Sequence, residues 1–329
     1  MSSHGSNALP EIVRSDVAGL PPELKGGVVA IGNFDGVHRG HQVVLDAARA
    51  EATRRGVPAL ALTFEPHPRE VFSNEPMFRL TPPAEKAELL GLCGFDAVVE
   101  QQFDGAFAGQ SAEAFVADVL LAGMGASHVV VGDDFRFGAK RRGDTAMLDR
   151  LVGATVIDAH LQADEAISSS RIRTALREGK PDKAAELLGR RWRFAATVSH
   201  GRKVGRTIGY PTANMELPGG AELAHGIYAV RYRRPDGTLI DGVASHGQRP
   251  TFDDGAPLFE TFLFDFSGDL YGEVAHATLF ARLRGEEKFD GVEALVAQMD
   301  RDSEEAHELL RTAEPLGGID AALNFKAGT

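Results

Sequence analysis

One change of pattern, close to residue 188, divides this chain of 329 residues into two parts that must fold differently. Before it, short apolar runs alternate with stretches of helical periodicity. Most of these runs are continuously apolar, as strands buried on both faces require, so the first part is predicted to be a parallel sheet covered by helices. After residue 188, strands follow one another with only loops between them, which predicts a small antiparallel barrel.

The first part contains the clearest strand and helix signals. The predicted strands are residues 28–31, 59–64, 97–99, 128–131 and 155–157. The predicted helices are residues 41–55, 83–92, 112–121 and 145–151. Thr81-Pro82 is typical of an N-cap followed by proline at the first helical position.

The second part begins after a helical stretch, residues 171–188, that is interrupted at Gly179-Lys180-Pro181. The predicted strands are residues 194–199, 227–233, 239–244, 258–266 and 274–282, and a helix is predicted over 292–310. The resulting division is a lead-in at 1–25, a first domain at 26–188 and a second domain at 189–329.

Composition limits the partners of this chain. The formal net charge is −12, and the basic residues form only small clusters, which fit small phosphorylated ligands better than nucleic acid. No run approaches the roughly 18 apolar residues of a membrane span, and residues 1–25 lack a signal-peptide pattern. Cys93 is the only cysteine, so no internal disulfide forms. We expect a cytoplasmic protein with no nucleic-acid or membrane partner and no obligate protein partner.

The segment Gly32-Asn33-Phe34-Asp35-Gly36-Val37-His38-Arg39-Gly40-His41 joins the first predicted strand to the first predicted helix. A helix N-terminus presents unpaired N–H groups and a positive dipole end to an anion. His38 and His41 are three residues apart, so both can face one phosphate group. Two alternatives stay open: a metal pair, which would need further ligands, or a turn without chemistry.

A second phosphate-binding candidate is Ser168-Ser169-Ser170-Arg171-Ile172-Arg173. Serines at a helix start either cap it or bind phosphate, and the arginines add positive charge. The alternative is an ordinary N-cap with solvated arginines. The chain contains no Gly-x-x-x-x-Gly-Lys-Ser/Thr loop, and no Gly-x-Gly-x-x-Gly follows the first strand, which weakens a dehydrogenase interpretation.

The second part carries its own polar motif, Gly205-Arg206-Thr207-Ile208-Gly209-Tyr210-Pro211-Thr212-Ala213-Asn214. Gly209 and Pro211 fix the backbone path, and Thr212 and Asn214 then present neutral oxygens suited to Mg²⁺ or phosphate-bound water. The alternative is a simple turn at Pro-Thr-Ala-Asn.

Glu260 stands out within the predicted strand 258–266. Alternation places it on one face with Leu258, Phe262, Phe264 and Phe266. A carboxylate in such company is either paired with a buried cation or retained for chemistry such as general-base catalysis. The alternative is a position at an open barrel end, where the side chain points into water.

The first-part motifs together carry a family resemblance. His-x-Gly-His with the downstream Ser-Ser-Ser-Arg-Ile-Arg resembles the nucleotidylyltransferase superfamily. Further motifs narrow the resemblance: Thr63-Phe64-Glu65-Pro66-His67-Pro68, Leu80-Thr81-Pro82, Phe103-Asp104 with Phe107-Ala108, and Val131-Gly132-Asp133-Asp134-Phe135-Arg136-Phe137-Gly138. With these, residues 28–188 are similar to the FMN adenylyltransferase module of bacterial bifunctional riboflavin kinase/FAD synthetases.

This resemblance implies a Rossmann-like α/β nucleotidylyltransferase domain in which the FMN phosphate attacks the α-phosphorus of ATP and pyrophosphate leaves. The implied ATP-binding residues are Gly32, Phe34, Asp35, Gly36, His38, His41, Ser169, Ser170 and Arg171, with His38 and His41 catalytic. The implied FMN-binding residues are Phe64, His67, Pro68, Asp134 and Phe135. Ser170 departs from the threonine common in the family but keeps the hydroxyl.

Residues 190–310 look like the riboflavin kinase module of the same enzymes. The motifs are Gly-Tyr-Pro-Thr-Ala-Asn, His225-Gly226-Ile227-Tyr228, Arg249-Pro250-Thr251-Phe252, Glu260, Asp265-Phe266-Ser267-Gly268-Asp269-Leu270-Tyr271-Gly272 and Lys288-Phe289-Asp290. The resemblance implies a small antiparallel six-stranded β-barrel with a C-terminal helix. It also implies that Gly209, Pro211, Thr212 and Asn214 hold Mg·ATP and that Glu260 deprotonates riboflavin. Val204 and His246 depart from the family pattern.

The two resemblances together predict an enzyme that phosphorylates riboflavin to FMN and adenylylates FMN to FAD. Its ligands would be ATP, riboflavin and FMN, with Mg²⁺ accompanying ATP and the flavins serving as substrates and products. Two alternatives are a chain that keeps only one of these activities and a flavin-binding protein without catalysis. A tRNA-acting relative is a third, which the net charge of −12 opposes.

Overall fold

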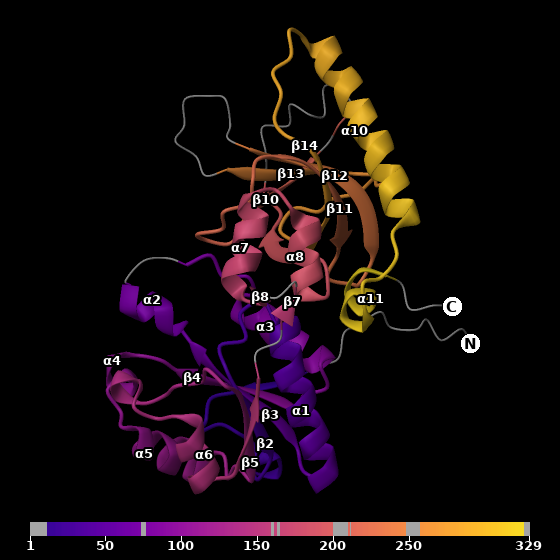
Figure 1. Ribbon diagram of the computed structural model, residues 1–329. Helices are drawn as coiled ribbons and strands as arrows, with labels where there is room; N and C mark the ends of the chain where they lie inside the picture. The colour runs from indigo at the N-terminus through magenta and orange to yellow at the C-terminus, as the bar shows by residue number, and fades with distance from the viewer. Residues whose placement is uncertain are drawn as a thin grey trace, which may run out of the picture. The chain divides into compact units, whose positions relative to one another are not determined.

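The computed structural model describes residues 12–73, 77–158, 161–162, 165–199, 210, 212–247 and 257–325. The chain divides into two compact units, Leu9–Ser169 and a unit that runs from Ser170 to Thr329. Each unit has its own sheet (Figure 1). Within the described residues, no helix is both long and apolar enough to cross a membrane.

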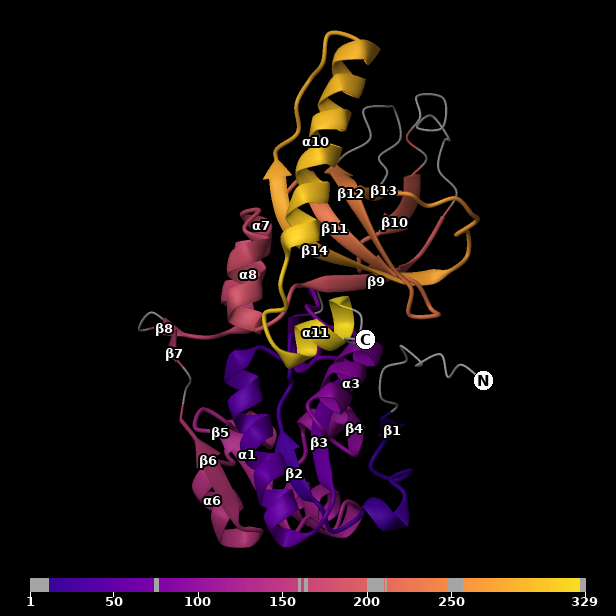
Figure 2. The same cartoon turned by 90° about the vertical axis from the view of Figure 1, so that its right-hand side faces the viewer.

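The first unit is built on a six-stranded parallel sheet with the order β1-β4-β3-β2-β5-β6. The strands are β1 Val13–Ser15, β2 Val28–Ile31, β3 Ala59–Glu65, β4 Ala97–Gln102, β5 His128–Gly132 and β6 Ala154–Ile157. The central strands are buried along almost their whole length, which explains their continuously apolar sequences. The sheet confirms the predicted parallel α/β fold, and Figure 2 shows β1 beside β4 at one edge.

Helices cover both faces of this sheet. They are α1 Arg39–Arg55, α2 Pro68–Ser73, α3 Pro83–Leu92, α4 Gly105–Ala108, α5 Ala112–Ala114, the π-helical segment η2 Phe115–Gly123 and α6 Thr145–Leu151, with short 3₁₀ turns at Pro22–Leu24 and Ala139–Arg141. A small hairpin, β7 Leu161–Gln162 and β8 Glu165–Ala166, follows β6. Figure 1 shows α1 on one face and α5 and α6 on the other.

The chain order of the strands reverses between β2 and β5, because β3 and β4 are added on one side of β2 and β5 and β6 on the other. In an open α/β sheet, ligands bind outside the carboxyl ends of the strands at such a switch point. The segments that leave β2 and β5 here are residues 32–38 and residues 133–135, which contain several predicted site residues. The fold therefore places the predicted nucleotide loop where this topology favours binding.

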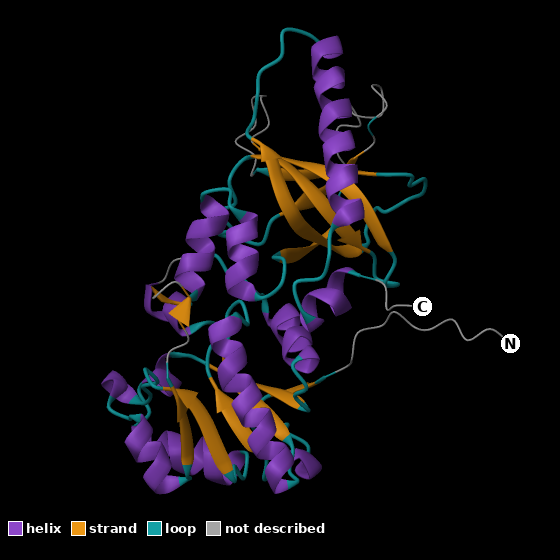
Figure 3. Cartoon of the chain, turned by 45° about the vertical axis from the view of Figure 1, so that its right-hand side comes forward, coloured by secondary structure: helices purple, strands orange, loops and turns teal. Residues whose placement is uncertain are grey.

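The second unit contains a six-stranded antiparallel sheet with the order β10-β13-β12-β11-β14-β9. The strands are β9 Arg193–Thr197, β10 Thr212–Glu216, β11 Gly226–Arg233, β12 Leu239–Gly247, β13 Leu258–Leu263 and β14 Val274–Arg284. A bridge from Ser199 to Asn214 joins the two edges, so the sheet nearly closes into the predicted barrel (Figure 3).

Strand β10 corrects the interpretation of residues 212–216. No strand is predicted there, and Pro-Thr-Ala-Asn has a simple turn as its alternative, but Thr212 and Asn214 lie on a strand paired with β13. Strand β13 is also shorter than predicted, since it ends at Leu263 and Asp265 adopts a φ of 50°. Phe264 and Phe266 therefore lie beyond the strand, although the Phe264 ring still contacts that of Phe262, with centroids 6.0 Å apart.

The helix α10, Val292–Thr312, packs along the outside of the barrel (Figure 3). Its Ala306 and Leu310 join Ala229, Val243 and Phe280 in one buried cluster. Residues 259, 261 and 263 of β13 are buried on the opposite face of that strand. Glu260 and Phe262 therefore lie on the outer face, toward α10.

Two helices, α7 Ser169–Arg177 and α8 Pro181–Leu188, cluster with the second unit except for Ser169. The sequence predicts that residues 26–188 form one domain and residues 189–329 the other. Which of these segments folds independently stays a prediction. Part of the predicted lead-in, residues 13–15, forms strand β1 of the first unit.

A buried carboxylate anchors the last helix, α11 Gly318–Asn324, to the second unit. Asp320 is fully buried and pairs with the Arg191 guanidinium. It also accepts hydrogen bonds from the Arg191 N–H at 3.0 Å, the Leu316 N–H at 3.0 Å and the Asn324 amide at 2.8 Å. The guanidinium of Arg191 stacks over the Phe280 ring, 4.1 Å from its centroid. Asp320 thus neutralises a cation that packs against the barrel.

We expect Asp320→Ala to lower the free energy of unfolding of the second unit by about 3–5 kcal/mol, because it leaves a partly buried guanidinium without its counter-ion. Trp192 is the only tryptophan and is buried in this unit, so its fluorescence in a urea titration reports the unit by itself. The control is Asp182→Ala, an exposed carboxylate on α8, with an expected loss below about 1 kcal/mol. Equal losses in the two variants would contradict the anchoring role.

Candidate functional sites in the two units

The loop after β2 has an unusual backbone. Phe34 and Val37 adopt positive φ angles of 49° and 42°, and Gly36 one of 91°. Non-glycine residues in this region cost about 1–3 kcal/mol each and cluster at ligand sites. The loop is held by Thr81, whose hydroxyl accepts the Gly36 N–H at 2.9 Å and whose own N–H donates to the buried Asp35 carboxylate at 3.0 Å.

The prediction that Thr81 caps a helix is wrong. The helix α3 begins after Pro82, which occupies the N-cap position and provides no side-chain cap. The Thr81 hydroxyl instead fixes a loop 45 residues earlier in the chain. No local sequence signal could have revealed this role.

The two histidines lie against each other at the start of α1. This helix begins at Arg39, earlier than the predicted residue 41, because His38 is its N-cap and its Nδ1 accepts the His41 N–H at 3.2 Å. The imidazole rings stack with centroids 3.6 Å apart, and the Phe34 ring contacts His41 edge-on at 5.4 Å. Both rings therefore lie on one side of the helix terminus.

The electrostatics of this pair favour a neutral imidazole. Burial, together with the nearby His38 and Lys86, holds the pKa of His41 well below its usual range. Its Nδ1 is buried and has no hydrogen-bond partner among the described residues. A neutral ring offers one donor and one acceptor, so His41 has hydrogen-bonding capacity left for a ligand.

The serine motif reaches the same loop from far downstream. The Ser169 hydroxyl donates to the Asp35 carbonyl at 2.8 Å. Gly40 is packed so closely that a Cβ there would lie 3.4 Å from the Ile167 carbonyl and 3.2 Å from the His38 ring. Ser170 and Arg171 belong to the second unit, so their role toward the nucleotide stays a prediction.

The predicted flavin residues border a row of phenylalanine rings. Phe64, at the end of β3, is buried, and its ring lies 5.8 Å from Phe103 and 6.1 Å from Phe107. Phe72 on α2 contacts Phe103 at 5.7 Å and is 71% exposed. Phe103 and Phe107 belong to one of the family motifs, but their sequence predicts no role for them. The ring contacts identify them as part of an apolar platform beside Phe64.

The remaining flavin candidates lie at the start of α2 and on the segment after β5. His67 and Pro68 are half-buried at the start of α2, and the His67 Nδ1 accepts the Arg69 N–H at 3.1 Å. Asp134 is exposed, and Phe135 stacks on Phe137 at 5.7 Å. The Phe137 ring contacts Phe115, and Phe115 in turn contacts Phe107.

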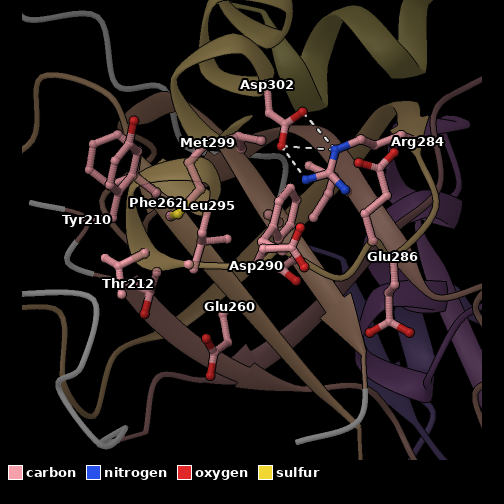
Figure 4. A pocket seen from close by; sticks show the side chains of 18 residues that line it. Tyr210, Thr212, Glu260, Phe262, Arg284, Glu286, Asp290, Leu295, Met299 and Asp302 are labelled. Atoms are coloured by element: carbon pink, nitrogen blue, oxygen red, sulfur yellow. Dashed lines mark hydrogen bonds and ion pairs between the residues drawn. The ribbon is translucent and has the colours of Figure 1, made fainter. Parts of the chain in front are cut away.

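A pocket of about 700 Å³ opens in the second unit between the barrel and the segment that leads into α10 (Figure 4). It is lined by Tyr210, Thr212, Ile227, Val243, Ala244, Ser245, Glu260, Phe262, Arg284, Glu286, Glu287, Phe289, Asp290, Gly291, Val292, Leu295, Met299 and Asp302. Volumes of about 300–1,000 Å³ are typical of small-molecule sites.

Strand register brings the predicted kinase residues together, and of these Thr212 and Glu260 line the pocket while Asn214 does not. Asn214 and Ser245 both lie directly opposite Glu260, and Thr212 lies opposite Phe262. Opposed residues in antiparallel strands share a face, so the side chains of Thr212, Asn214 and Glu260 lie on one surface.

The polar atoms of this surface are available to a ligand. Asn214 is buried, and its Oδ1 has no hydrogen-bond partner among the described residues. Glu260 is half-buried and makes no ion pair within the part of the chain that the structure describes. The predicted Gly209 and Pro211 lie outside the described residues.

The opposite side of the pocket is closed by an ion pair that no sequence pattern indicates. The guanidinium of Arg284 on β14 lies 2.7 Å from a carboxylate oxygen of Asp302 on α10, and the Gln298 amide donates to Asp302 at 2.8 Å. Figure 4 shows this pair across the pocket from Thr212 and Tyr210. The Tyr210 ring packs on Phe262 with centroids 4.6 Å apart. Since the pair joins a strand to a helix, only the fold could reveal it.

Two residues of the second unit, Val204 and His246, depart from the family pattern. Val204 lies outside the described residues. His246 is buried and does not line the pocket; its ring lies 5.2 Å from His225 and 6.1 Å from Phe259. Burial and the neighbouring His225 lower its pKa.

A parallel α/β unit with paired histidines at its switch point, followed by a barrel unit with a carboxylate in its pocket, defines a nucleotide-using transferase of two domains. Comparison with known families agrees. The FAD synthetase family model matches residues 20–172, and the riboflavin kinase family model matches residues 188–310.

Similar proteins cover nearly the whole chain. The bifunctional riboflavin kinase/FMN adenylyltransferase of Haemophilus influenzae is 39% identical over 86% of this chain and 94% of its own length. That of Pseudomonas fluorescens is 40% identical over 88% and 95%. A crystal structure described as a macrolide-efflux protein from Streptococcus pneumoniae aligns with a TM-score of 0.81 and 30% identity, covering 92% of this chain and all of that one.

The chain therefore belongs to the bifunctional riboflavin kinase/FMN adenylyltransferase family. This confirms the predicted resemblance and the order of the two modules along the chain.

Proposed function

We propose that this chain makes FAD from riboflavin in two ATP-dependent steps, phosphorylation in the second unit and adenylyl transfer in the first. The observation that carries the proposal is the polar row of β10 and β13, in which Asn214 faces Glu260 across adjacent strands and Glu260 lines a pocket of about 700 Å³. Family membership supports both steps. We place the reaction in the cytoplasm, which the single cysteine favours.

In the kinase step, Glu260 takes the proton of the riboflavin 5′-hydroxyl as its oxygen attacks the γ-phosphorus of ATP. The bond between that phosphorus and the β,γ-bridging oxygen breaks, and ADP leaves. Proton removal by a positioned carboxylate contributes about 10²–10⁴-fold to such reactions. The apolar side chains of Phe262, Leu295 and Met299 line the same pocket and suit the flat flavin ring.

The residues present fit Mg²⁺ at this site, since hard cations prefer oxygen ligands and Asn214 Oδ1 is a buried oxygen without a partner among the described residues. Thr212 and Asn214 would hold the ion together with the ATP phosphates. When bound, it supplies positive charge that offsets the charge developing on the phosphates. The described residues contain no cluster of three histidine, cysteine or carboxylate side chains that could hold a metal alone.

In the adenylyl-transfer step, a phosphate oxygen of FMN attacks the α-phosphorus of ATP, the α–β bridging bond breaks and pyrophosphate leaves. No covalent enzyme intermediate is needed, so the protein acts by positioning and by stabilising charge. His38 and His41 contribute hydrogen bonds at the helix N-terminus, where the dipole also favours phosphate. Phe64, Phe135 and their neighbouring rings would contact the flavin.

A time course with riboflavin, ATP and Mg²⁺, followed by chromatography of the flavins, tests both steps at once. We expect FMN to appear first and FAD to follow. Accumulation of FMN without FAD would show that only the kinase is active. Conversion of added FMN but not of riboflavin would show the reverse, and binding of flavins without turnover would show a non-catalytic protein.

A further inference from the structure

A buried lysine lies directly behind the loop that carries the two histidines. Lys86, on α3, has a side chain that is 1% exposed. Its ammonium group donates to Thr63 Oγ1 and Glu65 Oε1, both at 2.7 Å, and to the Asn33 carbonyl at 3.4 Å. An ammonium group has three protons, and each has an acceptor here. Burial of such a charge is unfavourable unless well-placed acceptors offset the loss of water.

The acceptors of Lys86 come from two different segments of the proposed active site. Asn33 lies in the nucleotide loop, residues 32–38, which contains five of the predicted ATP-binding residues, from Gly32 to His38. Thr63 and Glu65 lie at the end of β3, and Glu65 belongs to the flavin loop, residues 64–68, which contains the predicted flavin-binding residues Phe64, His67 and Pro68. The Thr63 hydroxyl also donates to the Asn33 carbonyl, at 3.2 Å. The Lys86 ammonium group thus links the nucleotide loop to the flavin loop through hydrogen bonds on their buried side.

Glu65 connects Lys86 to further hydrogen bonds of the flavin loop. Arg79 donates to both Glu65 oxygens, at 2.7 and 2.8 Å, and to Glu70 at 2.9 Å. The Glu70 carboxylate in turn accepts the His67 N–H at 3.2 Å. A continuous chain of charge-assisted hydrogen bonds therefore runs from the Asn33 carbonyl to the backbone of His67. Such bonds are shorter and stronger than neutral ones and favour one geometry.

We propose that Lys86 is a positioning residue for adenylyl transfer, whose buried ammonium group fixes the nucleotide loop against the flavin loop so that the FMN phosphate meets the α-phosphorus of ATP. Lys86 itself touches neither substrate. This inference rests on the proposed function of the first unit. It predicts that loss of the lysine disturbs the alignment of two substrates that each loop still binds.

The test uses the full chain and the variant Lys86→Met, which keeps the length of the side chain and removes its charge. We expect kcat for FAD formation to fall about 100-fold, the loss that a misplacement of about 1 Å produces, while KM for ATP and for FMN each change less than about 3-fold. Calorimetric titration with FMN should still give full binding stoichiometry. The riboflavin kinase rate of the same sample should be unchanged. Lys25→Met, at an exposed lysine of the first unit, is the matched control.

A second variant keeps the proposal testable if Lys86→Met folds poorly. Lys86→Gln keeps a hydrogen-bond donor toward Thr63 and Glu65 and leaves the Glu65–Arg79 pair intact, and we expect it to regain thermal stability without regaining rate. Recovery of rate together with stability would show a merely structural role and overturn the inference, as would an unchanged kcat in Lys86→Met. A wild-type protein that forms no FAD from FMN would instead overturn the proposed function, and the inference with it.

Discussion

Glu260→Gln is expected to lower the riboflavin kinase rate about 10²–10⁴-fold, the usual contribution of a general base. Glutamine keeps the size of the side chain and its place on β13 opposite Asn214 and Ser245. It cannot accept a proton from the riboflavin hydroxyl, so the loss should fall on kcat while KM for riboflavin changes little. Conversion of added FMN to FAD should continue at the wild-type rate, because that reaction belongs to the other unit. Both rates are measured on one sample by chromatography of the flavins.

The matched control is Glu287→Gln. Glu287 lines the same pocket and is exposed, so this variant changes the pocket charge by the same amount without touching the polar row. We expect its kinase rate to stay within about 3-fold of the wild type, as is usual for exposed carboxylates whose pairing is weak. Equal losses in the two variants would argue that charge alone matters, and loss of FAD formation in Glu260→Gln would argue against two separate sites.

Glu260 also shows what the sequence could and could not predict. Its place among apolar residues marks it as an anomaly, because alternation along a strand needs only local information. Its surroundings need the fold, since β13 ends at Leu263 and the face that carries Glu260 packs toward α10, where Phe262 and Phe264 also lie.

Strands whose burial is visible in their own residues are predicted well. The run at 28–31 is apolar throughout because it is buried on both faces. Strand β10 escapes prediction because its sequence, Thr-Ala-Asn-Met-Glu, is short and half polar, and its strand conformation depends on pairing with β13 and on the bridge to Ser199. Strand β1 escapes prediction because three largely exposed residues carry no pattern.

The motifs indicate residues that would contact ligands, whereas the residues that hold them in place are visible only in the structure. His38 and His41 can be singled out because their spacing relative to a helix start has a direct chemical meaning. Thr81 and Glu65 belong to family motifs that do not indicate their role, and Lys86 belongs to none, since each acts through a partner that is distant in the sequence. The residues around such a supporting residue in the sequence do not predict its role, because a hydroxyl or ammonium group can donate to any acceptor that the fold brings near.

His41→Ala is expected to lower the rate of FAD formation from FMN about 10²–10³-fold, the usual effect of removing one donor that stabilises transition-state charge. The His41 ring is neutral because burial and its neighbours hold its pKa well below the usual range, so it acts as a hydrogen-bonding group rather than as a positive charge. Alanine leaves the helix start intact, since the bond from the residue 41 N–H to His38 Nδ1 needs no side chain at position 41. The loss should therefore fall on kcat.

His128→Ala provides the comparison for His41. His128 begins β5, and its ring bonds the Thr155 hydroxyl at 2.9 Å on the exposed edge of the same unit, remote from the strand ends that carry the loops. We expect this variant to keep at least half of the wild-type FAD-forming rate, and both variants to keep full riboflavin kinase activity. If His41→Ala retained wild-type FAD formation, the stacked histidines would be a structural cap of α1 and the phosphate-binding role would pass to the backbone N–H groups alone. If it abolished both reactions, the two units could not work independently, and the division of labour between them would be wrong.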